Sequence, residues 1–181
     1  MDATLREILI ATKNVGKIKE LEKLLDNSPL ILRSLNEFPQ ISDVDEIGET
    51  FAENAILKAR KYAEKTNLWA LADDSGLEVA ALNNAPGVFS ARYAGENSSN
   101  EQKIAKLLEE MQKKSDRRAR FVCAMAISDE TGNIRFIAEG ICNGKIAVTP
   151  SGTNGFGYDP IFIPEGFEQT FGELSDDIKQ K

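Results

Sequence analysis

The sequence predicts an α/β fold built on a mixed sheet, because strand-like segments alternate with amphipathic helices along the chain. One observation behind this prediction is that apolar residues recur at helical spacing directly after strand-like runs. Another is that the strand-like segments 119–127 and 133–140 are joined by Asp129-Glu130-Thr131-Gly132, a sequence typical of a hairpin turn. The length of 181 residues indicates one domain, with room for two lobes around a cleft.

The expected elements follow in chain order. Further strands are expected at 7–11, 30–35, 68–72, 77–80 and 161–163, and 144–147 prolongs or follows the strand at 133–140. Helices are expected after the polar loop 12–17, over 51–66 and over 101–114. Thr50 and Glu53 form a capping-box pattern that marks the start of the 51–66 helix. A last helix begins after Ser175 and is not completed by residue 181.

The composition excludes several kinds of chemistry. The net charge of −7 argues against broad binding to nucleic acid or to an anionic membrane surface. The chain has no histidine, which excludes Ser-His and Cys-His nucleophile pairs and histidine-ligated zinc. Acid–base work must therefore come from carboxylates, lysines, tyrosines or metal-bound water.

The cysteines and the apolar segments bear on location. Cys123 and Cys142 lie in strand-like segments, and we expect them to be buried thiols in a reducing cytoplasm. The charged N-terminal residues do not form a signal peptide, and no apolar run reaches membrane-spanning length.

Two adjacent carboxylates at the end of the 68–72 strand make the first candidate site. We expect the strand to carry Asp73 and Asp74 out to its end and to break at Ser75-Gly76. Neighbouring side chains on a strand point to opposite faces, so the two carboxylates should have different roles. Buried acidic groups are costly unless they are paired or bind a metal.

Two other segments have both a functional and a structural interpretation. The loop 12–17 joins a strand to a helix, which favours an anion site at the helix start, but Asn14 is equally an ordinary N-cap. In the glycine-rich loop 151–160, Phe156 and Tyr158 suit stacking on a flat ring. Taken alone, a structural turn with core aromatics is the better interpretation of that loop.

The acidic loop 43–49 and Lys58 have similar alternatives. A cluster of acids in a loop is more often solvated, but its oxygens also suit a hard cation such as magnesium. Lys58 is by default a surface charge, and its functional interpretation is contact with an anion.

Together these segments resemble the inosine/xanthosine triphosphate pyrophosphatase family, also called Ham1-like. The matching motifs, in order, are Thr12-Lys13-Asn14-Val15-Gly16-Lys17, then Gly48-Glu49-Thr50-Phe51-Ala52-Glu53-Asn54-Ala55 with Lys58-Ala59, Ala72-Asp73-Asp74-Ser75-Gly76-Leu77, Pro86-Gly87 through Ser90-Ala91-Arg92-Tyr93, and Gly155-Phe156-Gly157-Tyr158-Asp159-Pro160. Each motif is weak alone, but their order and spacing over nearly the whole chain are specific.

The resemblance implies an elongated α/β domain over residues 1–181, with two lobes on a long mixed sheet and a central substrate cleft. It also implies magnesium-dependent hydrolysis of ITP, dITP or XTP to the monophosphate and pyrophosphate, in a cytoplasmic homodimer. By the same resemblance Asp74 is the catalytic base and a metal ligand, and the second metal ligand is Glu46 or Asp45, with Glu46 favoured. The implied substrate-binding residues are Thr12, Lys13, Asn14, Val15, Gly16, Lys17, Lys58, Ser75, Phe156, Gly157, Tyr158, Asp159 and Lys179.

The chain departs from the family pattern in two places. Asn154 stands where the family usually has the first of two glycines, and asparagine is the residue that best replaces glycine in a left-handed conformation. The Ser-His-Arg segment that the family carries after the position of Lys179 is missing, together with the end of the last helix. Two alternatives therefore stay open: a Maf-like nucleotide pyrophosphatase of different base preference, and a nucleotide-binding module without catalysis.

Overall fold

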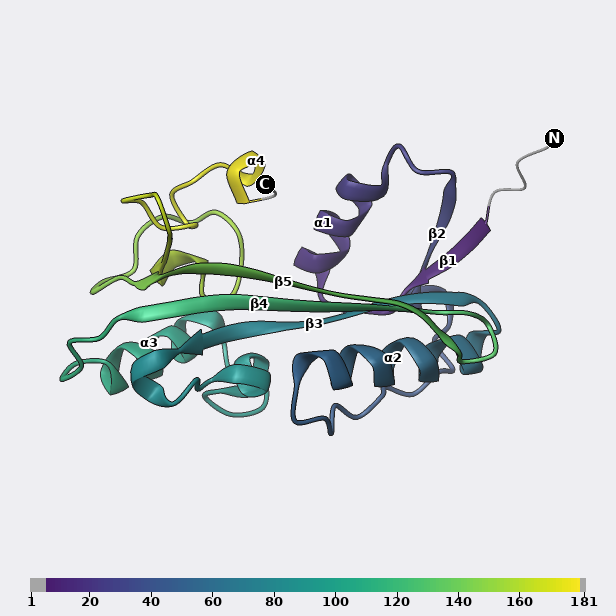
Figure 1. Cartoon of the computed structure of the whole chain (residues 1–181), viewed down its shortest axis with the longest axis horizontal. Helices are drawn as coiled ribbons and strands as arrows, with labels where there is room; N and C mark the ends of the chain where they lie inside the picture. Colours follow the sequence, from purple (N-terminus) through teal and green to yellow (C-terminus); the bar gives the residue numbers. More distant parts are fainter. Residues whose placement is uncertain (1–5, 180–181) are drawn as a thin grey trace. The chain divides into compact units, whose positions relative to one another are not determined.

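A computed structural model describes residues 6–179 of the protein. Its strands form one six-stranded sheet in the order β2-β1-β3-β4-β5-β6 (Figure 1). Their bounds are β1 Arg6–Ile10, β2 Leu30–Ser34, β3 Trp69–Val79, β4 Arg118–Ser128, β5 Ile134–Ile146 and β6 Phe162–Pro164. β1 pairs in parallel with β2 and β3, whereas β5 and β6 are antiparallel. The predicted mixed-sheet α/β class is confirmed.

The helices connect these strands. The α-helices are α1 Val15–Leu25, α2 Phe51–Thr66, α3 Asn100–Glu110 and α4 Asp176–Lys179. Four short 3₁₀ helices are η1 Leu35–Glu37, η2 Ala80–Leu82, η3 Gly87–Arg92 and η4 Asp159–Ile161. The predicted capping box at the start of α2 is confirmed, because the Glu53 amide donates to Thr50 Oγ1 and the Thr50 amide donates to the Glu53 carboxylate. None of the helices in this part of the chain has both the length and the apolar character needed to cross a bilayer.

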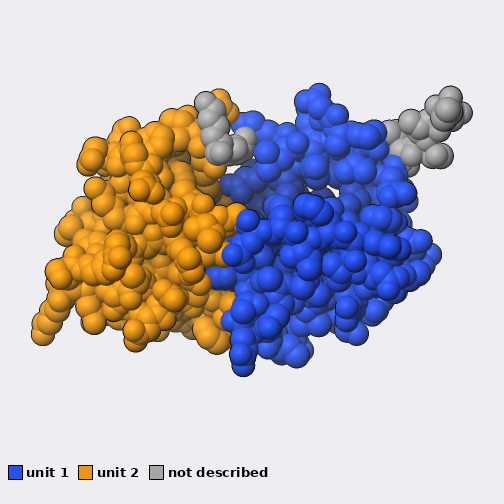
Figure 2. Space-filling view, viewed as in Figure 1, with its two compact units in different colours: residues 1–74, 123–139 blue, residues 75–122, 140–181 orange. Residues whose placement is uncertain are grey.

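The chain divides into two compact units (Figure 2). The first unit comprises residues up to Asp74 together with Cys123–Glu139, and the second comprises Ser75–Val122 and Gly140–Lys181. In the first unit α1 and α2 lie on opposite faces of the sheet (Figure 1). A buried cluster beneath α1 contains Ile8, Ile10, Leu21 and Leu71.

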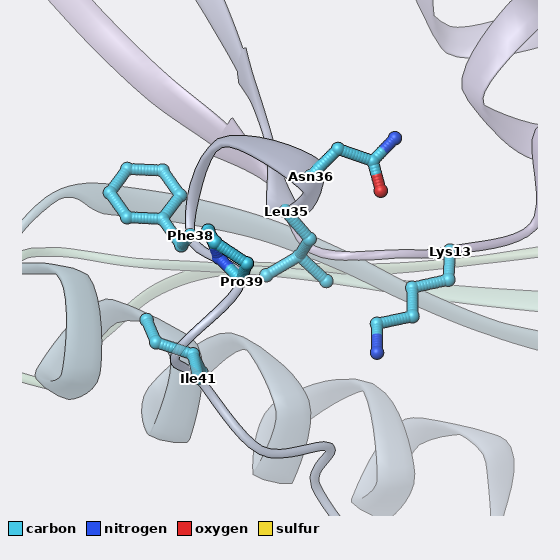
Figure 3. Close-up of a pocket in the computed structure, with 6 residues that line it drawn as sticks. All are labelled: Lys13, Leu35, Asn36, Phe38, Pro39 and Ile41. Atoms are coloured by element: carbon cyan, nitrogen blue, oxygen red, sulfur yellow. The ribbon is translucent and has the colours of Figure 1, made fainter.

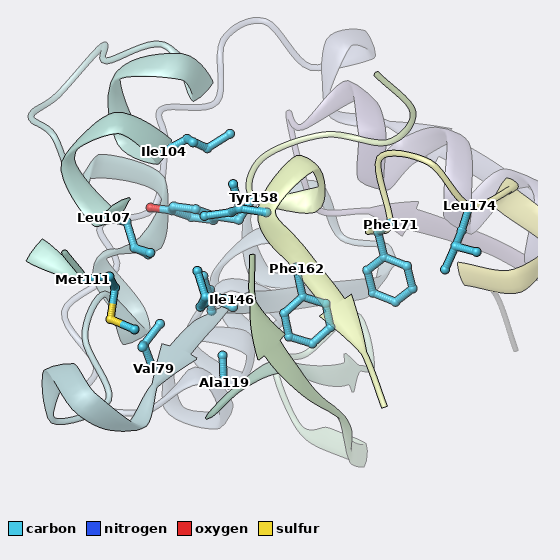
Figure 4. Close-up of a cluster of buried hydrophobic side chains, with 12 residues drawn as sticks. Val79, Ile104, Leu107, Met111, Ala119, Ile146, Tyr158, Phe162, Phe171 and Leu174 are labelled. Carbon is cyan, nitrogen blue, oxygen red and sulfur yellow. The ribbon is translucent and has the colours of Figure 1, made fainter. Parts of the chain in front are cut away.

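The second unit has the larger aromatic core (Figure 4). The ring centroids of Phe121 and Phe162 lie 4.6 Å apart, and those of Phe162 and Phe171 lie 5.4 Å apart. Leu107 and Met111, from α3 and the residue after it, are fully buried in the same cluster. This packing holds the loop that follows β5 against the sheet.

The structure corrects one prediction about the acidic pair. β3 does not break at Ser75-Gly76 but runs on to Val79, so Asp73 and Asp74 lie inside an eleven-residue strand. The reason is tertiary: β3 pairs with β1 only up to Leu71, but it also has β4 as a hydrogen-bonded neighbour, and such pairing outweighs the local tendency of Ser-Gly to turn.

The structure also answers three other questions of element bounds, and only the end of α3 differs from its prediction. α3 ends at Glu110 rather than at residue 114, and turns follow it, in which the amides of Gln112 and Lys114 bond to carbonyls three residues back instead of four. The segments 133–140 and 144–147 form the single strand β5. The expected last helix is present as α4, directly after Ser175; the rest of that prediction lies outside the described residues.

The two cysteines are free thiols, and both are partly rather than fully buried. Cys123 lies on β4 and Cys142 on β5. Burial, followed by the charge of Asp73, raises the pKa of the Cys123 thiol to about 11. The expectation of two buried thiols was therefore correct about their pairing state and too strong about their burial.

Candidate active site

The loop before α1 is organised by the side chain of Asn14. Its Oδ1 accepts hydrogen bonds from the amides of Gly16 at 2.9 Å and Lys17 at 3.3 Å, which confirms Asn14 as the N-cap. Thr12 Oγ1 in turn accepts from the Asn14 amide at 3.2 Å. No acidic residue lies in the first turn of α1, so the positive end of the helix dipole is not neutralised there. An anion site at this position stays a prediction, and the cap does not exclude it.

The side chains of Asp73 and Asp74 lie on opposite faces of the sheet, as their adjacent positions on a strand require. The Asp73 carboxylate is buried and pairs with Lys17 of α1, with Nζ 2.6 Å from Oδ2. The Asp74 carboxylate instead contacts two side chains of α2, Asn54 and Lys58. The two acids thus have different surroundings, and their different roles stay a prediction.

Lys58 lies between two carboxylates. Its ammonium nitrogen is 2.6 Å from Oε1 of Glu46, with which it forms a hydrogen bond, and 3.6 Å from Oδ1 of Asp74. The side chain of Lys58 is only 11% exposed, so its interpretation as a surface charge is wrong. Glu46 therefore belongs to the same cluster as Asp74, although the two are far apart in sequence.

The acidic loop has an alternating pattern that separates Glu46 from Asp45. Val44, Glu46 and Gly48 are half-buried, whereas Asp45, Ile47 and Glu49 are exposed. Because side chains of an extended segment alternate in direction, only every second residue faces α2. The structure brings Glu46, and not Asp45, to Lys58.

Burial and charge act on both groups of the pair. Burial opposes the charge of Lys58, but Asp74 and Glu46 together raise the pKa of its ammonium. For Asp74, burial is the largest influence and raises the pKa of the carboxyl; Glu46 adds to this rise, while Lys58 and Asn54 oppose it. A carboxylate with a raised pKa is a better proton acceptor than an ordinary aspartate.

The donor set of this cluster is compatible with magnesium but does not form a complete cage. Within residues 6–179, no group of three or more acidic, histidine or cysteine side chains is placed to hold a metal ion. Magnesium typically takes one or two carboxylates and completes its shell with water and substrate phosphates. Asp74 and Glu46 fit that requirement. Asp73 Oδ1, which is buried with no hydrogen-bond partner among the described atoms, is a further anionic oxygen on the opposite face of the strand.

In the second unit, Asp159 organises the glycine-rich loop. Its Oδ2 accepts a hydrogen bond from the Phe156 amide at 2.7 Å, and its carboxylate pairs with Lys179 at 2.7 Å. Gly155 has a φ of 72°, and a Cβ there would lie 2.0 Å from Asp159 Oδ2, so glycine is required by both conformation and space. Asn154 does not have a positive φ; the left-handed residue is Gly155 itself.

The two aromatic residues of this loop have different environments. Tyr158 is buried in the core cluster and donates its hydroxyl to the Ser90 carbonyl at 2.9 Å, so its ring packs as the structural interpretation expects (Figure 4). Phe156 is only partly buried, and the Lys179 ammonium lies 4.1 Å from the centre of its ring. Phe156 is therefore the aromatic residue of this loop whose ring lies outside the buried core cluster. Gly157, between them, also has a positive φ, of 63°.

Lys13 contributes to a small cavity beside the loop before α1 (Figure 3). The cavity has a volume of about 150 Å³, and its lining residues are Lys13, Leu35, Asn36, Phe38, Pro39 and Ile41. The exposed Lys13 ammonium pairs with Asp43. Lys13 thus pairs with the acidic loop, Val15 is largely exposed, and Ser75 is half-buried on β3.

Two residues of the site were not identified from the sequence as part of it. Asn54 donates its side-chain amide to Asp74 Oδ2 at 3.0 Å and is completely buried. The hydroxyl of Tyr62 accepts a hydrogen bond from the Val44 amide of the acidic loop. A signal for both was present, since Asn54, Lys58 and Tyr62 recur every four residues on one helix face.

Comparison with known proteins gives a consistent result. A family model described as the Ham1 family matches residues 8–181. A relative from Bacillus anthracis named dITP/XTP pyrophosphatase is 45% identical, over 97% of this chain and 88% of its own length. A relative of the same name from Synechococcus is 46% identical, over 98% of this chain and 84% of its own length.

Solved structures agree with the sequence relatives. A HAM1 protein from Coxiella burnetii aligns with a TM-score of 0.89 and 45% identity, covering 97% of this chain and 90% of that one. A structure from Mycobacterium abscessus described as a nucleoside-triphosphatase / dITP/XTP pyrophosphatase aligns with a TM-score of 0.79 and 41% identity, covering 96% and 90%.

The raised pKa of Asp74 predicts a stability effect with a definite sign. The pKa of Asp74 in the folded protein lies above the value of about 3.9 in an unfolded chain. The contribution of Asp74 to the free energy of unfolding is therefore complete below a pH of about 3.9 and is lost as pH rises through the folded pKa. Asp74→Asn removes this loss, so without metal the variant should become more stable than the unchanged protein as pH rises from 3.5 to 7. Urea unfolding with a chelator present measures the difference.

Asp129→Asn is the control of opposite sign for this measurement. Hydrogen bonds from Thr131, Asn133 and Arg135 hold the pKa of Asp129 well below its usual range. The Asp129→Asn variant should therefore become less stable than the unchanged protein as pH rises. If Asp74→Asn became less stable than the unchanged protein over the same pH range, burial would not be the dominant influence on the pKa of Asp74.

Proposed function

Since the chain belongs to the Ham1 family, we propose that it hydrolyses non-canonical purine nucleoside triphosphates such as dITP, ITP and XTP, and releases the monophosphate and pyrophosphate. The observation that most supports this is the buried Lys58 ammonium between Glu46 and Asp74. A cation and two acidic groups on adjacent elements are what a metal-assisted attack on a phosphate needs in a chain with no histidine.

We propose that the first unit binds the triphosphate. The backbone amides at the start of α1 and the ammonium of Lys17 are suited to phosphate oxygens, with Asp73 holding Lys17 in place. Thr12, Asn14 and Gly16 fix the shape of this loop through hydrogen bonds around the helix cap. In this proposal Lys13 and Val15 contribute backbone contacts, because their side chains are exposed.

Asp74 and Glu46 are the residues that would hold a magnesium ion. When bound, the ion would neutralise phosphate charge and make a water molecule more acidic. Asp74 accepts the proton of the attacking water. The water oxygen forms a bond to the α-phosphorus, and the bond from that phosphorus to the bridging oxygen breaks. Lys58 stabilises the added negative charge from its fixed position.

We propose that the loop of the second unit binds the base. The partly buried ring of Phe156 offers a stacking surface, and its amide is fixed by Asp159. The ammonium of Lys179 lies over that ring and pairs with Asp159, so a stacked base would displace or rearrange it. The backbone of Gly157 and Tyr158 borders the same surface, and Ser75 on β3 is proposed as a further substrate contact.

The central prediction for this function concerns Asp74→Asn. With ITP and magnesium, kcat should fall at least about 1000-fold, because both proton acceptance and a metal ligand are lost, while KM changes by less than about threefold. Production of IMP and pyrophosphate is measured. Lys17→Ala is the complementary variant and should mainly raise KM. Retention of near-normal turnover by Asp74→Asn would refute the role of Asp74.

The same assay separates the two alternatives. A Maf-like base preference would give a higher kcat/KM for UTP than for ITP. The proposal requires a higher kcat/KM for ITP than for UTP, and also higher than for GTP. No turnover of any of the three would indicate a binding module.

We further propose that the protein is a cytoplasmic homodimer in which β5 lies at the interface. β6 pairs only with residues Gly144–Ile146 of β5, which leaves the rest of that edge without a neighbouring strand in the described part of the chain. Phe136 and Ile137 on this segment are 57% and 48% exposed. Exposed apolar edge strands tend to be covered by another chain, and a second copy offers the same segment. The free thiols are compatible with a reducing compartment.

Replacing Phe136 and Ile137 together by lysine should convert the dimer to monomers. The reason is that two charges on each copy would face each other in a symmetric contact. Sedimentation equilibrium at micromolar concentration measures the mass, and Val148→Lys, at an exposed residue outside the strands, is the control. A monomeric unchanged protein, or a double variant that stays dimeric, would contradict this interface.

A further inference from the structure

Three of the contacts between the acidic loop and α2 are regularly spaced. The Val44 amide donates to the Tyr62 hydroxyl at 3.3 Å, Lys58 donates to Glu46 at 2.6 Å, and the Gly48 amide donates to Asn54 Oδ1 at 2.7 Å. From one contact to the next, the residue number in the loop rises by two and the residue number in the helix falls by four. The loop therefore runs antiparallel to the helix, in a fixed register.

The dimensions of the two backbones explain why this register works. Four residues of an α-helix advance by about 6 Å. Two residues of an extended chain advance by about 6.6 Å. The two repeats match over three contacts, so every second loop residue meets a side chain from the same helix face. A slip by one residue would turn Asp45 or Ile47 toward Lys58 and turn Glu46 toward solvent.

Asn54 has a second contact that Tyr62 lacks. Its Nδ2 donates to Asp74 Oδ2 at 3.0 Å, while its Oδ1 accepts from Gly48. One buried amide thus joins the loop that carries Glu46 to the strand that carries Asp74. Space around this amide is limited, since a Cβ at Gly48 would lie 2.7 Å from Asn54 Oδ1 and 2.8 Å from the Cβ of Glu53.

We propose that Asn54 is a positioning residue that fixes Glu46 and Asp74 relative to each other, so that both carboxylates serve one divalent cation. Tyr62 fixes the far end of the loop and so protects the register. This inference rests on the proposed function for the identity of the metal-binding pair. Lys58 compensates the charge of the two carboxylates, and Asn54 sets where they are.

A purely structural role for Asn54 makes a different prediction. If its amide served only folding, variants would lower the melting temperature and the folded fraction, and the folded molecules would bind metal normally. If it positions the carboxylates, folded variants should bind metal more weakly. Metal affinity of the folded protein therefore separates the two roles, and it is measured without turnover.

The experiment uses the full chain with four substitutions. Asn54→Leu keeps a similar volume and removes both hydrogen bonds, whereas Asn54→Asp keeps the acceptor for Gly48 and places a carboxylate against Asp74. Gly48→Ala disturbs the same contact from the loop side, where the backbone φ is not left-handed, and so carries less risk of unfolding. Thr66→Ala is the matched control, because it removes a hydrogen bond of α2, to the Tyr62 carbonyl, that does not contact the loop.

Mn²⁺ alone is the metal probe, with its binding followed by electron paramagnetic resonance, and kcat and KM for ITP are measured in parallel. We expect Asn54→Leu and Gly48→Ala to weaken Mn²⁺ binding and to lower kcat by roughly 10- to 100-fold, the usual effect of losing a residue that orients metal ligands. KM should change by less than about threefold, because the loop before α1 is untouched. Thr66→Ala should bind Mn²⁺ as the unchanged protein does.

The results distinguish a failure of the positioning role from a failure of the proposed function. Folded Asn54→Leu or Gly48→Ala that keeps its Mn²⁺ affinity and kcat within twofold would overturn the positioning role, even if the unchanged protein hydrolyses ITP. If Asn54→Leu does not fold, Gly48→Ala decides the question alone. An unchanged protein that does not hydrolyse ITP, but whose variants lose Mn²⁺ affinity, would refute the proposed function and leave the positioning role supported.

Discussion

The arrangement of the first unit depends on the ammonium of Lys58. Two carboxylates held close together and away from water repel each other and lose hydration, which makes the cluster costly unless a cation compensates it. Lys58 supplies that cation and is held by both acids, so that their charges raise its pKa in spite of its burial. The same compensation leaves a net negative charge at Glu46 and Asp74, which suits a further, divalent cation.

Strand geometry then divides the work of the two adjacent aspartates. Because β3 continues through Asp73 and Asp74, successive side chains must point to opposite faces, and each face is covered by a different helix of the first unit (Figure 1). Asp73 therefore holds the lysine of α1, and Asp74 joins the cluster on α2. A strand that ended at this point would not have enforced the separation so strictly.

Much of this was predictable from local sequence patterns. The N-cap Asn14, the capping box of α2 and the hairpin turn after β4 depend on contacts within a few residues, and each was predicted correctly. The continuation of β3 through Ser75-Gly76 was not predictable in this way, because it depends on pairing with β4, which lies far away in sequence. The end of α3 was missed because the helical spacing of Leu107 and Met111 continues across the last residue of the helix.

The candidate site shows the same division. Motif order identified Asp74, Glu46 and Lys58, but could not choose between Glu46 and Asp45, because the register of a loop on a helix is a tertiary property. Asn54 and Tyr62 resolve it through hydrogen bonds to the loop; their common helix face is visible in the sequence, but their loop partners are not. Tyr158 shows the opposite case, since a motif that suggested stacking on a ligand places that ring in the core.

The most direct test of this account is a crystal structure of the protein with magnesium and a non-hydrolysable ITP analogue. The account predicts one magnesium ion bound by carboxylate oxygens of both Asp74 and Glu46, with Asn54 still bonded to Asp74 and Gly48. A magnesium ion bound through Asp45 instead of Glu46, or one that does not contact Asp74, would contradict it.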